Sequence, residues 1–446
     1  MSLSKKIVFN TAVQVASKTL SVFFTLLTTI LLTSYLGRES FGDYIYVITL
    51  MVMFGSLADW GTATIGIRES AKQPKKQGQI LANILVLRLL LSFLAAGLLI
   101  VLAFIVPLQT SNPEFLRQAI IAASLFLIFN ALKSSFGIVF QVKLQMQKMA
   151  IADIATSALI FLFSWFFIQQ QLGLVSLIIA YLLAIVSGLV LAACLAFKTI
   201  KFVFRFDRQI ISKLIKESLP MGAILLMFTI DNKIDTVMLG AIKGSGTVGI
   251  YGIAYRVYDV LILGAAFLMN ALLPVFSKWS NVSQEGNKLK QGYQKAFDVL
   301  LLMGVGVVIL VWFLAPWMVQ ILTQQKFIEF ADAVVVLRIL SLAVFLAYFN
   351  HLTGYTIIAL GRQRSYFFVA LTALIFNVTA NLFFIPRFSY YGAATVTILT
   401  EAIVLVITTI FIFRLLKFIP SFFSFPKTAV QLMKQVVIGR KQIFWQ

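Results

Sequence analysis

Charged side chains inside otherwise apolar stretches are the residues of this chain whose types and spacing could do chemistry. Six of them define the question: Lys18, Asp231, Lys233, Asp235, Arg256 and Glu401. An ionisable group within a membrane-spanning helix is costly, so it marks either a wet pathway or a paired structural site. Cations in such a pathway can hold an anionic substrate, and carboxylates there can carry a coupling proton or sodium ion.

The clearest pattern lies in the first apolar run. Gln14, Lys18, Ser21, Thr25 and Thr28 are spaced at i, i+4, i+7, i+11 and i+14, which places them on one helical face. The spacing predicts a polar stripe that lines a wet cavity, with Lys18 as its charge. The alternative is a lysine near the inner end of the helix that extends its ammonium group to the membrane surface.

A second polar cluster lies near the middle of a later run and contains Asp231, Asn232, Lys233 and Asp235. The two aspartates share a helical face, whereas Lys233 projects elsewhere. A cluster this polar cannot face lipid, so it must face a cavity or pair with another helix.

Arg256 lies in the next run and has Asp259 one turn later, with Tyr251, Tyr255 and Tyr258 beside them. Two interpretations stay open. The pair is either an internal Arg–Asp contact, or Arg256 binds an anionic substrate while the tyrosines stack on sugar.

Structural contacts are also expected for polar residues in the apolar runs. Glu401 is expected to make an interhelical contact with Asn377 and Asn381, worth roughly 1 kcal/mol. Asp59 is expected to join a charge cluster close to Arg68 and Glu69 at the inner surface.

The chain has one histidine, His351, and one cysteine, Cys194. A structural role is therefore expected for His351, and neither a metal site nor a cofactor is predicted.

The elements that must position these residues are apolar helices of bilayer-spanning length. Sixty per cent of the 446 residues are hydrophobic, which is far from the usage of soluble domains. The predicted spans are Phe9–Ser34, Phe41–Ala63, Ile80–Val106, Arg117–Phe140, Ala150–Gln170, Gly173–Phe197, Ser218–Ile242, Val248–Phe276, Tyr293–Leu322, Ala333–Leu360, Ser365–Pro386 and Tyr390–Leu416.

The connections between these spans carry very unequal charge. One set holds 26 Lys and Arg residues, and the other holds five. By the positive-inside rule the rich set is cytoplasmic, which predicts that both termini are cytoplasmic and that the helix count is even. The same rule accounts for most of the net charge of +21, so nucleic-acid binding is not predicted.

The chain also divides into two similar halves. The tetrapeptide Ala-Leu-Ile-Phe at residues 158–161 recurs at 373–376, and Phe-Phe-Ile at 166–168 recurs at 383–385. Twelve helices in two parallel six-helix lobes around a central cavity are therefore predicted, an all-α polytopic membrane fold. The predicted parts are residues 1–197, a basic inter-lobe linker at 198–217, residues 218–416, and a basic aromatic tail at 417–446.

Several loop motifs resemble those of polysaccharide-synthesis flippases of the multidrug/oligosaccharidyl-lipid/polysaccharide exporter superfamily. They are YLGRESFGDY at 35–44, ADWG at 58–61, IRE at 67–69, DTVMLG at 235–240, VGIY at 248–251 and ALGRQR at 359–364. The resemblance covers nearly the whole chain. It implies a non-enzymatic carrier of lipid-linked sugars by alternating access, in which cations of the first and the eighth predicted spans, Phe9–Ser34 and Val248–Phe276, hold the substrate's pyrophosphate. Lys18 and Arg256 occupy those helices here.

The resemblance implies that the chain moves a polyprenyl-diphosphate-linked oligosaccharide to the outer leaflet for O-antigen, capsule or exopolysaccharide synthesis. Lys18, Lys233 and Arg256 are the candidates for the phosphates, and Asp231, Asp235 and Glu401 for ion coupling. The implied partners are the lipid-linked substrate, the bilayer and polysaccharide assembly proteins, in the bacterial inner membrane. The alternatives are a cation-coupled multidrug exporter with the same fold and a membrane glycosyltransferase or polymerase.

Overall fold

The computed structural model describes residues 3–106, 109–280 and 286–422, and every regular element in these ranges is a helix. The helices are α1 (Leu3–Asp59), α2 (Thr62–Lys72), η1 (Pro74–Lys76), α3 (Gln77–Ile105), α4 (Pro113–Val142), α5 (Met146–Gln169), α6 (Leu174–Phe197), α7 (Arg208–Asp231), α8 (Ile234–Lys243), α9 (Ser245–Leu261), α10 (Leu263–Ser280), α11 (Gly286–Thr323), η2 (Gln324–Phe330), α12 (Ala333–Ala359) and α13 (Gln363–Leu416).

Among the described residues, nine helical stretches are long and apolar enough to cross a membrane. Two of the nine, Phe9–Lys72 and Ser365–Leu416, each contain two predicted spans. The predicted span Ser218–Ile242 is not one of the nine, because the helix breaks at Asn232 and Lys233, between α7 and α8. An apolar polytopic helical protein is thus confirmed, and the count of twelve and the placement of the termini stay predictions.

The junction of the first two predicted spans is a kink rather than a loop. Gly37 has φ 71° and ψ −178°, and helix continues on both sides of it. A positive φ favours glycine, so the residue type at this point fixes where the chain can bend.

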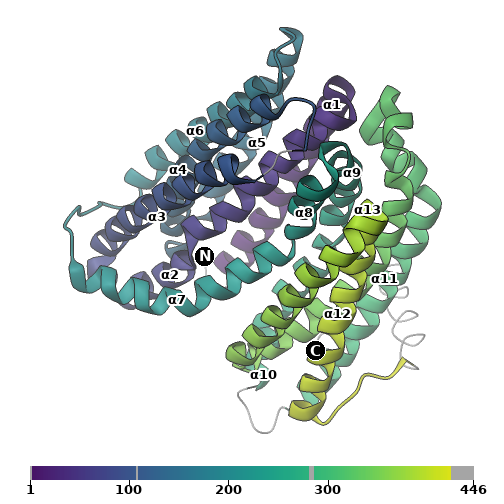
Figure 1. The fold of residues 1–446 in the computed structure, drawn as a ribbon. Helices are drawn as coiled ribbons and strands as arrows, with labels where there is room; N and C mark the ends of the chain where they lie inside the picture. The colour runs from purple at the N-terminus through teal and green to yellow at the C-terminus, as the bar shows by residue number, and fades with distance from the viewer. Residues whose placement is uncertain (1–2, 107–108, 281–285, 423–446) are drawn as a thin grey trace. The chain divides into compact units, whose positions relative to one another are not determined.

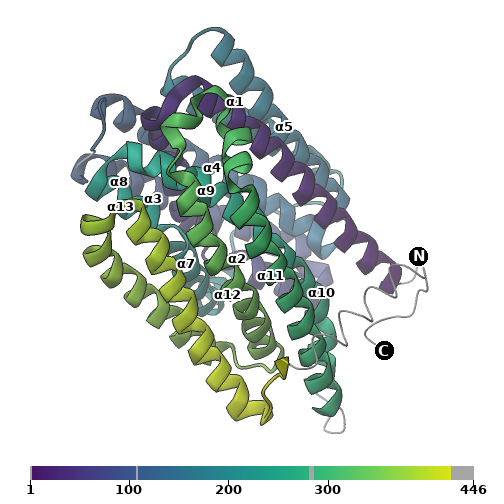
Figure 2. The same ribbon diagram turned by 90° about the vertical axis from the view of Figure 1, so that its right-hand side faces the viewer.

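A similar kink divides α13. Ser389 has φ 53° and follows Pro386, whose ring cannot be accommodated without loss of a helical hydrogen bond. The two limbs of α13 lie side by side in Figure 2.

The chain forms two compact units, each described here by itself. The first comprises Met1–Gly252 with Ile321–Phe330, and the second comprises Ile253–Gln320 with Ala331–Gln446. In the first unit α1 packs along α5, α3 packs against α4, and α6 packs against α4 and α5 (Figure 1). In the second unit α12 packs against α13 and α10.

The first unit has an apolar core toward one end of its bundle. Its fully buried side chains include Ile84, Val139 and Phe140, and α7 contributes Leu214. Part of the predicted inter-lobe linker is therefore helical, because α7 begins at Arg208 and packs on α1, α2 and α3. The predicted lobe boundaries themselves stay a prediction.

Candidate substrate and ion sites

The polar stripe of α1 becomes more buried along its length. Gln14 and Lys18 are exposed, Ser21 and Thr25 are half-buried, and Thr28 is buried. Thr25 donates its hydroxyl to the Ser21 carbonyl at 2.8 Å, so this hydroxyl is left to accept hydrogen bonds. The exposed end of the stripe is its charged end.

The edge of this stripe is fixed against α5 (Figure 2). Asn10 Nδ2 donates to the Leu144 carbonyl at 2.9 Å, and its Oδ1 accepts from the Met146 amide at 2.7 Å. Ser17 Oγ donates to the Ala150 carbonyl at 3.4 Å. These bonds hold α1 at one rotation, so Lys18 occupies a fixed position on the exposed side of the helix.

Arg88, one of the cations inside a predicted span, is neutralised within the first unit. Its side chain is 1% exposed and pairs with Asp59, whose side chain is 37% exposed. Arg88 Nε donates to Thr62 Oγ1 at 2.7 Å, and Nη1 donates to Ser134 Oγ at 3.0 Å. Asp59 thus binds Arg88 of α3, whereas the sequence grouped it with Arg68 and Glu69.

Lys133 is the second cation that is neutralised in this unit. Its Nζ lies 2.8 Å from Asp153 Oδ1, with the lysine side chain 7% and the aspartate side chain 40% exposed. Asp153 is a partner that was not predicted from the sequence. An acid inside the predicted span Ala150–Gln170 was the signal that could have found it.

The cluster at the end of α7 lies at a helix break. Asp231 and Lys233 are half-buried, and Asp235 in the first turn of α8 is buried. The Tyr251 hydroxyl donates to Asp235 Oδ2 at 3.0 Å, which ties α8 to α9 inside the first unit. The structure therefore pairs Asp235 with a neutral donor.

Arg256 on α9 is half-buried, and its buried Nε has no hydrogen-bond partner among the described residues. No ion pair joins it to Asp259 or to another described carboxylate. Tyr255 and Tyr258, on the same helix, pack together with ring centroids 4.8 Å apart. Of the two interpretations of Arg256, the internal Arg–Asp pair is therefore not observed.

Glu401 on α13 is held inside the second unit by neutral donors. Asn350 Nδ2 donates to Glu401 Oε2 at 2.6 Å and to its carbonyl at 2.8 Å, and the Tyr258 hydroxyl donates to Oε1 at 3.5 Å. The expected contact with Asn377 and Asn381 is not the one observed. Asn381 instead donates to Asn377 within the same helix at 2.7 Å.

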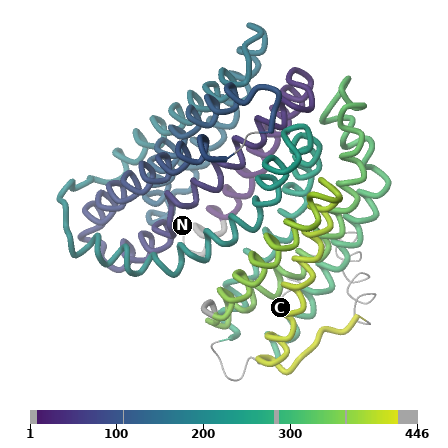
Figure 3. The backbone as a smooth tube through the Cα atoms, viewed as in Figure 1, coloured from purple at the N-terminus to yellow at the C-terminus, as the bar shows by residue number. Residues whose placement is uncertain are grey.

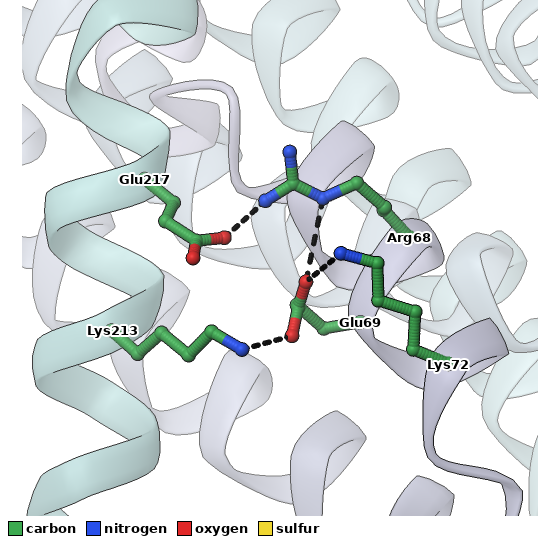
Figure 4. Close-up of polar contacts among 5 residues, drawn as sticks. All are labelled: Arg68, Glu69, Lys72, Lys213 and Glu217. Atoms are coloured by element: carbon green, nitrogen blue, oxygen red, sulfur yellow. Dashed lines mark hydrogen bonds and ion pairs between the residues drawn. The ribbon is translucent and has the colours of Figure 1, made fainter.

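A charge cluster joins α2 to α7 on the predicted inner side (Figure 4). Glu69, 3% exposed, accepts from Lys213 and from Lys72, the latter at 3.3 Å, and Arg68 pairs with Glu217. The hydrogen bond to Glu69 raises the pKa of the Lys213 ammonium. We call these five residues the α2–α7 ion cluster.

The motif at residues 35–44 packs tightly on α9. A β-carbon on Gly42 would lie 1.8 Å from the Ser245 carbonyl oxygen, so only glycine fits there. Asp43 accepts from Ser245 Oγ and, at 2.9 Å, from Thr110 Oγ1. The Arg38 amide donates to Glu329 Oε2 of η2 at 2.9 Å. Residues 35–44 thus have a packing role in addition to the resemblance that they carry.

His351 has a structural setting. Its Nδ1 lies 2.8 Å from the Ala347 carbonyl, and its ring stacks on Tyr355 at 6.1 Å. Across the described ranges no group of three or more His, Cys, Asp or Glu side chains could hold a metal ion.

The chain is similar in sequence to two protein families and to a curated membrane protein. The family described as polysaccharide biosynthesis protein matches residues 6–280, and the MatE family matches residues 220–383. An uncharacterised membrane protein of Methanocaldococcus jannaschii is 23% identical over 270 residues, which are 57% of this chain. The chain spans 62% of the length of that curated relative.

Two solved structures share the fold. An inward-facing multidrug resistance MATE family transporter of the MOP superfamily has a TM-score of 0.74 at 16% identity, covering 89% of this chain and 95% of its own. The lipid II flippase MurJ, in an inward closed conformation, has a TM-score of 0.75 at 15% identity, covering 98% and 94%. Because the first family match spans more than half of the chain, the chain belongs to the polysaccharide biosynthesis protein family.

Proposed function

We propose that this protein flips a polyprenyl-diphosphate-linked oligosaccharide from the inner to the outer leaflet, for the synthesis of a surface polysaccharide. The isoprenoid tail stays in lipid while the sugar and the diphosphate cross by alternating access between two six-helix lobes. The proposed location is the bacterial inner membrane, with both termini cytoplasmic. The matched families are transporters and flippases, and no catalytic role is proposed.

One observation carries the choice of an anionic substrate. Arg88 and Lys133 are neutralised by aspartates, whereas Lys18 and Arg256 have no ion pair with any carboxylate of the described residues. A buried dianion requires fixed positive charge, and charge-assisted bonds from arginine or lysine supply it. Lys18 and Arg256 are therefore proposed to hold the diphosphate, with Lys233 as a third candidate.

Polar groups near these cations suit the rest of the substrate. Gln14, Ser21 and Thr25 continue the stripe of Lys18, and Tyr255 lies one residue before Arg256. Aromatic faces and hydroxyl or amide groups are the side chains that bind sugars by stacking and hydrogen bonding. The stripe is proposed to receive the sugar next to the phosphates.

The membrane potential favours the proposed direction. With the cell interior negative, moving about two negative charges outward gains roughly 4–5 kcal/mol per 100 mV. Coupling to a proton or a sodium ion is a separate proposal, for which Asp231, Asp235 and Glu401 are the candidates.

The rival function is drug export, as in the MATE family transporter with the same fold. An exporter of organic cations would need an excess of carboxylates where it binds its cargo, by the same charge argument. The cations without an ion-pair partner, Lys18 and Arg256, favour the flippase over this rival.

A transport assay in proteoliposomes distinguishes the flippase from the drug exporter. Purified protein is reconstituted with a short polyprenyl-diphosphate oligosaccharide, and a membrane-impermeant sugar-binding probe follows its exposure, with an inside-negative potential on or off. Protein-dependent flipping that quickens with the potential is the expected result. Efflux of an organic cation without flipping of several lipid-linked sugars would refute the proposal.

A further inference from the structure

The segment between α6 and α7 is extended and firmly held. Residues 200–207 contain no helix and run past the start of α3 (Figure 3). The Val203 amide donates to the Gly78 carbonyl at 3.3 Å, and Asn83 Nδ2 donates to the Arg205 carbonyl at 3.0 Å. Asp207 caps α7 by accepting from the amides of Gln209 and Ile210. A peripheral segment is thus fixed to the bundle.

Aromatic side chains alternate along this segment and turn progressively outward. Phe202 packs edge-on against Phe136 and Phe197, with centroids 5.9 and 5.0 Å away. Phe204 stacks on Phe202 at 6.0 Å and is 67% exposed, and Phe206 is 69% exposed. The protein therefore anchors the first ring and leaves the next two uncovered.

Basic residues alternate with these rings. Lys201, Arg205 and Arg208 are all exposed, and none of them makes an ion pair with another described residue. Lys213, one helical turn farther on, is by contrast occupied by Glu69. The positive charge of this segment is thus available to an external anion.

We propose that residues 201–208 form an interfacial anchor that binds anionic phospholipid headgroups of the inner leaflet. Phe204 and Phe206 enter the boundary between headgroups and acyl chains, and Lys201, Arg205 and Arg208 contact the phosphates. Exposed aromatic residues alternating with cations are typical of segments that lie in this interface. The positive-inside rule predicts that the segment lies on the cytoplasmic side, where anionic lipids attract basic residues.

The proposal is independent of what the protein transports. It concerns lipid composition around one segment, so it survives if the flippase proposal fails. A single basic residue near an anionic surface is worth about 1 kcal/mol, which corresponds to about a fivefold local enrichment of anionic lipid. Screening by salt should reduce the enrichment.

A local fluorescence measurement tests the anchor in the full chain. Cys194 is replaced by serine, and Gln209→Cys, on the exposed start of α7, is labelled with an environment-sensitive fluorophore. In nanodiscs, quenching by phosphatidylglycerol with a nitroxide headgroup is compared with quenching by equally labelled phosphatidylcholine. The expected ratio for this labelled protein is about five or more, because about fivefold is the enrichment derived above for one of its three basic residues.

Two charge variants decide the outcome. The first variant should bring the quenching ratio to about one, and it combines Lys201→Gln, Arg205→Gln and Arg208→Gln. The matched control triple should leave the ratio unchanged, and it combines Arg362→Gln, Arg414→Gln and Lys417→Gln. Gel filtration checks that both variants remain folded. Equal quenching by the two lipids in the unsubstituted protein, or an enrichment that persists in the first triple, would overturn the proposal.

The contribution of Phe204 and Phe206 is measured separately. Phe204→Ser with Phe206→Ser should reduce quenching of the same label by nitroxides on the acyl chains. Phe202→Leu, which alters the ring that already packs on Phe136, should not reduce it. Unchanged acyl-chain quenching in the double variant would show that these rings do not enter the membrane.

Discussion

The charged residues inside the apolar helices have different kinds of partner in the two compact units. In the first unit the buried cations Arg88 and Lys133 are each matched by a carboxylate, Asp59 and Asp153. In the second unit the carboxylate of Glu401 is held by Asn350 and Tyr258, which are neutral. A matched pair is fixed in its charge state, whereas a carboxylate among neutral donors can gain or lose a charge without leaving a partner unpaired.

This difference in partners indicates different roles for the ion pairs and for Glu401. The two pairs of the first unit join contacting helices, α1 with α3 and α4 with α5, so they hold the bundle together. Glu401 is the candidate proposed in the second unit for a group whose charge changes during transport. The cations Lys18 and Arg256 belong to neither class, and they are the residues proposed to bind the substrate.

The largest stability loss should come from breaking a matched pair. Asp59→Asn leaves the buried Arg88 guanidinium without its counter-charge, which should cost about 3–5 kcal/mol. Thermal unfolding in detergent measures it. The double variant Asp59→Leu with Arg88→Met removes both charges and should recover most of the loss. A single variant as stable as the unsubstituted protein would show that the pair is not needed.

Lys133 and Asp153 provide a second, independent case of the same kind. Asp153→Asn should lower stability by about 3 kcal/mol for the same reason, although its carboxylate is 40% exposed. The reverse variant Lys133→Met leaves the half-exposed aspartate to water and should be the milder of the two. If Lys133→Met proves the more damaging, burial of the cation is not what makes the pair necessary.

The α2–α7 ion cluster should matter less because most of its members face solvent. Glu69→Gln removes the negative charge and one of the two acceptor oxygens that Lys213 and Lys72 use, and it should cost about 1–3 kcal/mol. Lys213 also sets a pH dependence, because its pKa is raised in the folded protein. Its contribution is present below the unfolded-state pKa of about 10.4 and is lost as the pH rises through the folded-state value.

The pH dependence is measured by comparing melting temperatures. From pH 8 to about pH 11, a range that spans the lysine pKa, the unsubstituted protein should lose its advantage over Lys213→Met. An advantage that stays constant across this range would mean that the Lys213–Glu69 contact does not stabilise the fold.

The smallest stability effect is expected at Glu401. Glu401→Gln keeps the shape of the side chain and its contacts with Asn350 and Tyr258, so it should cost less than about 1 kcal/mol. If Glu401 carries a coupling proton, the variant should transport at a rate that no longer responds to a pH gradient. Melting and transport are measured on the same preparation, and a large loss of stability would show that the charge of Glu401 is structural.

Hydropathy predicted the fold class because it depends on composition over long windows. The same windows cannot distinguish a loop from a kink. Gly37 and Ser389 bend continuous helices, and the predicted span Ser218–Ile242 is broken in its middle. These features depend on backbone angles at single residues, which composition does not encode.

The sequence shows where polar residues lie in the apolar runs, but it does not show which residues they contact. The positions of Arg88, Lys133, Glu401 and Asp59 inside or beside apolar runs can be read from the sequence, yet their contacts are with residues 20 to 51 positions away. Which helix faces which is decided by packing over the whole bundle. Asp59 was therefore grouped with its neighbours in sequence, although its partner is on α3.

A binding measurement tests most directly the proposal that Lys18 and Arg256 bind the diphosphate. The affinity of the purified protein for a polyprenyl diphosphate oligosaccharide is compared with that for the monophosphate, in the unsubstituted protein and in Lys18→Gln and Arg256→Gln. We predict that the diphosphate binds more tightly, by about tenfold for a charge-assisted contact, and that each variant loses most of this preference. Arg338→Gln, which removes a cation bonded to the Trp312 carbonyl, is the control. An undiminished preference in both site variants would contradict the account.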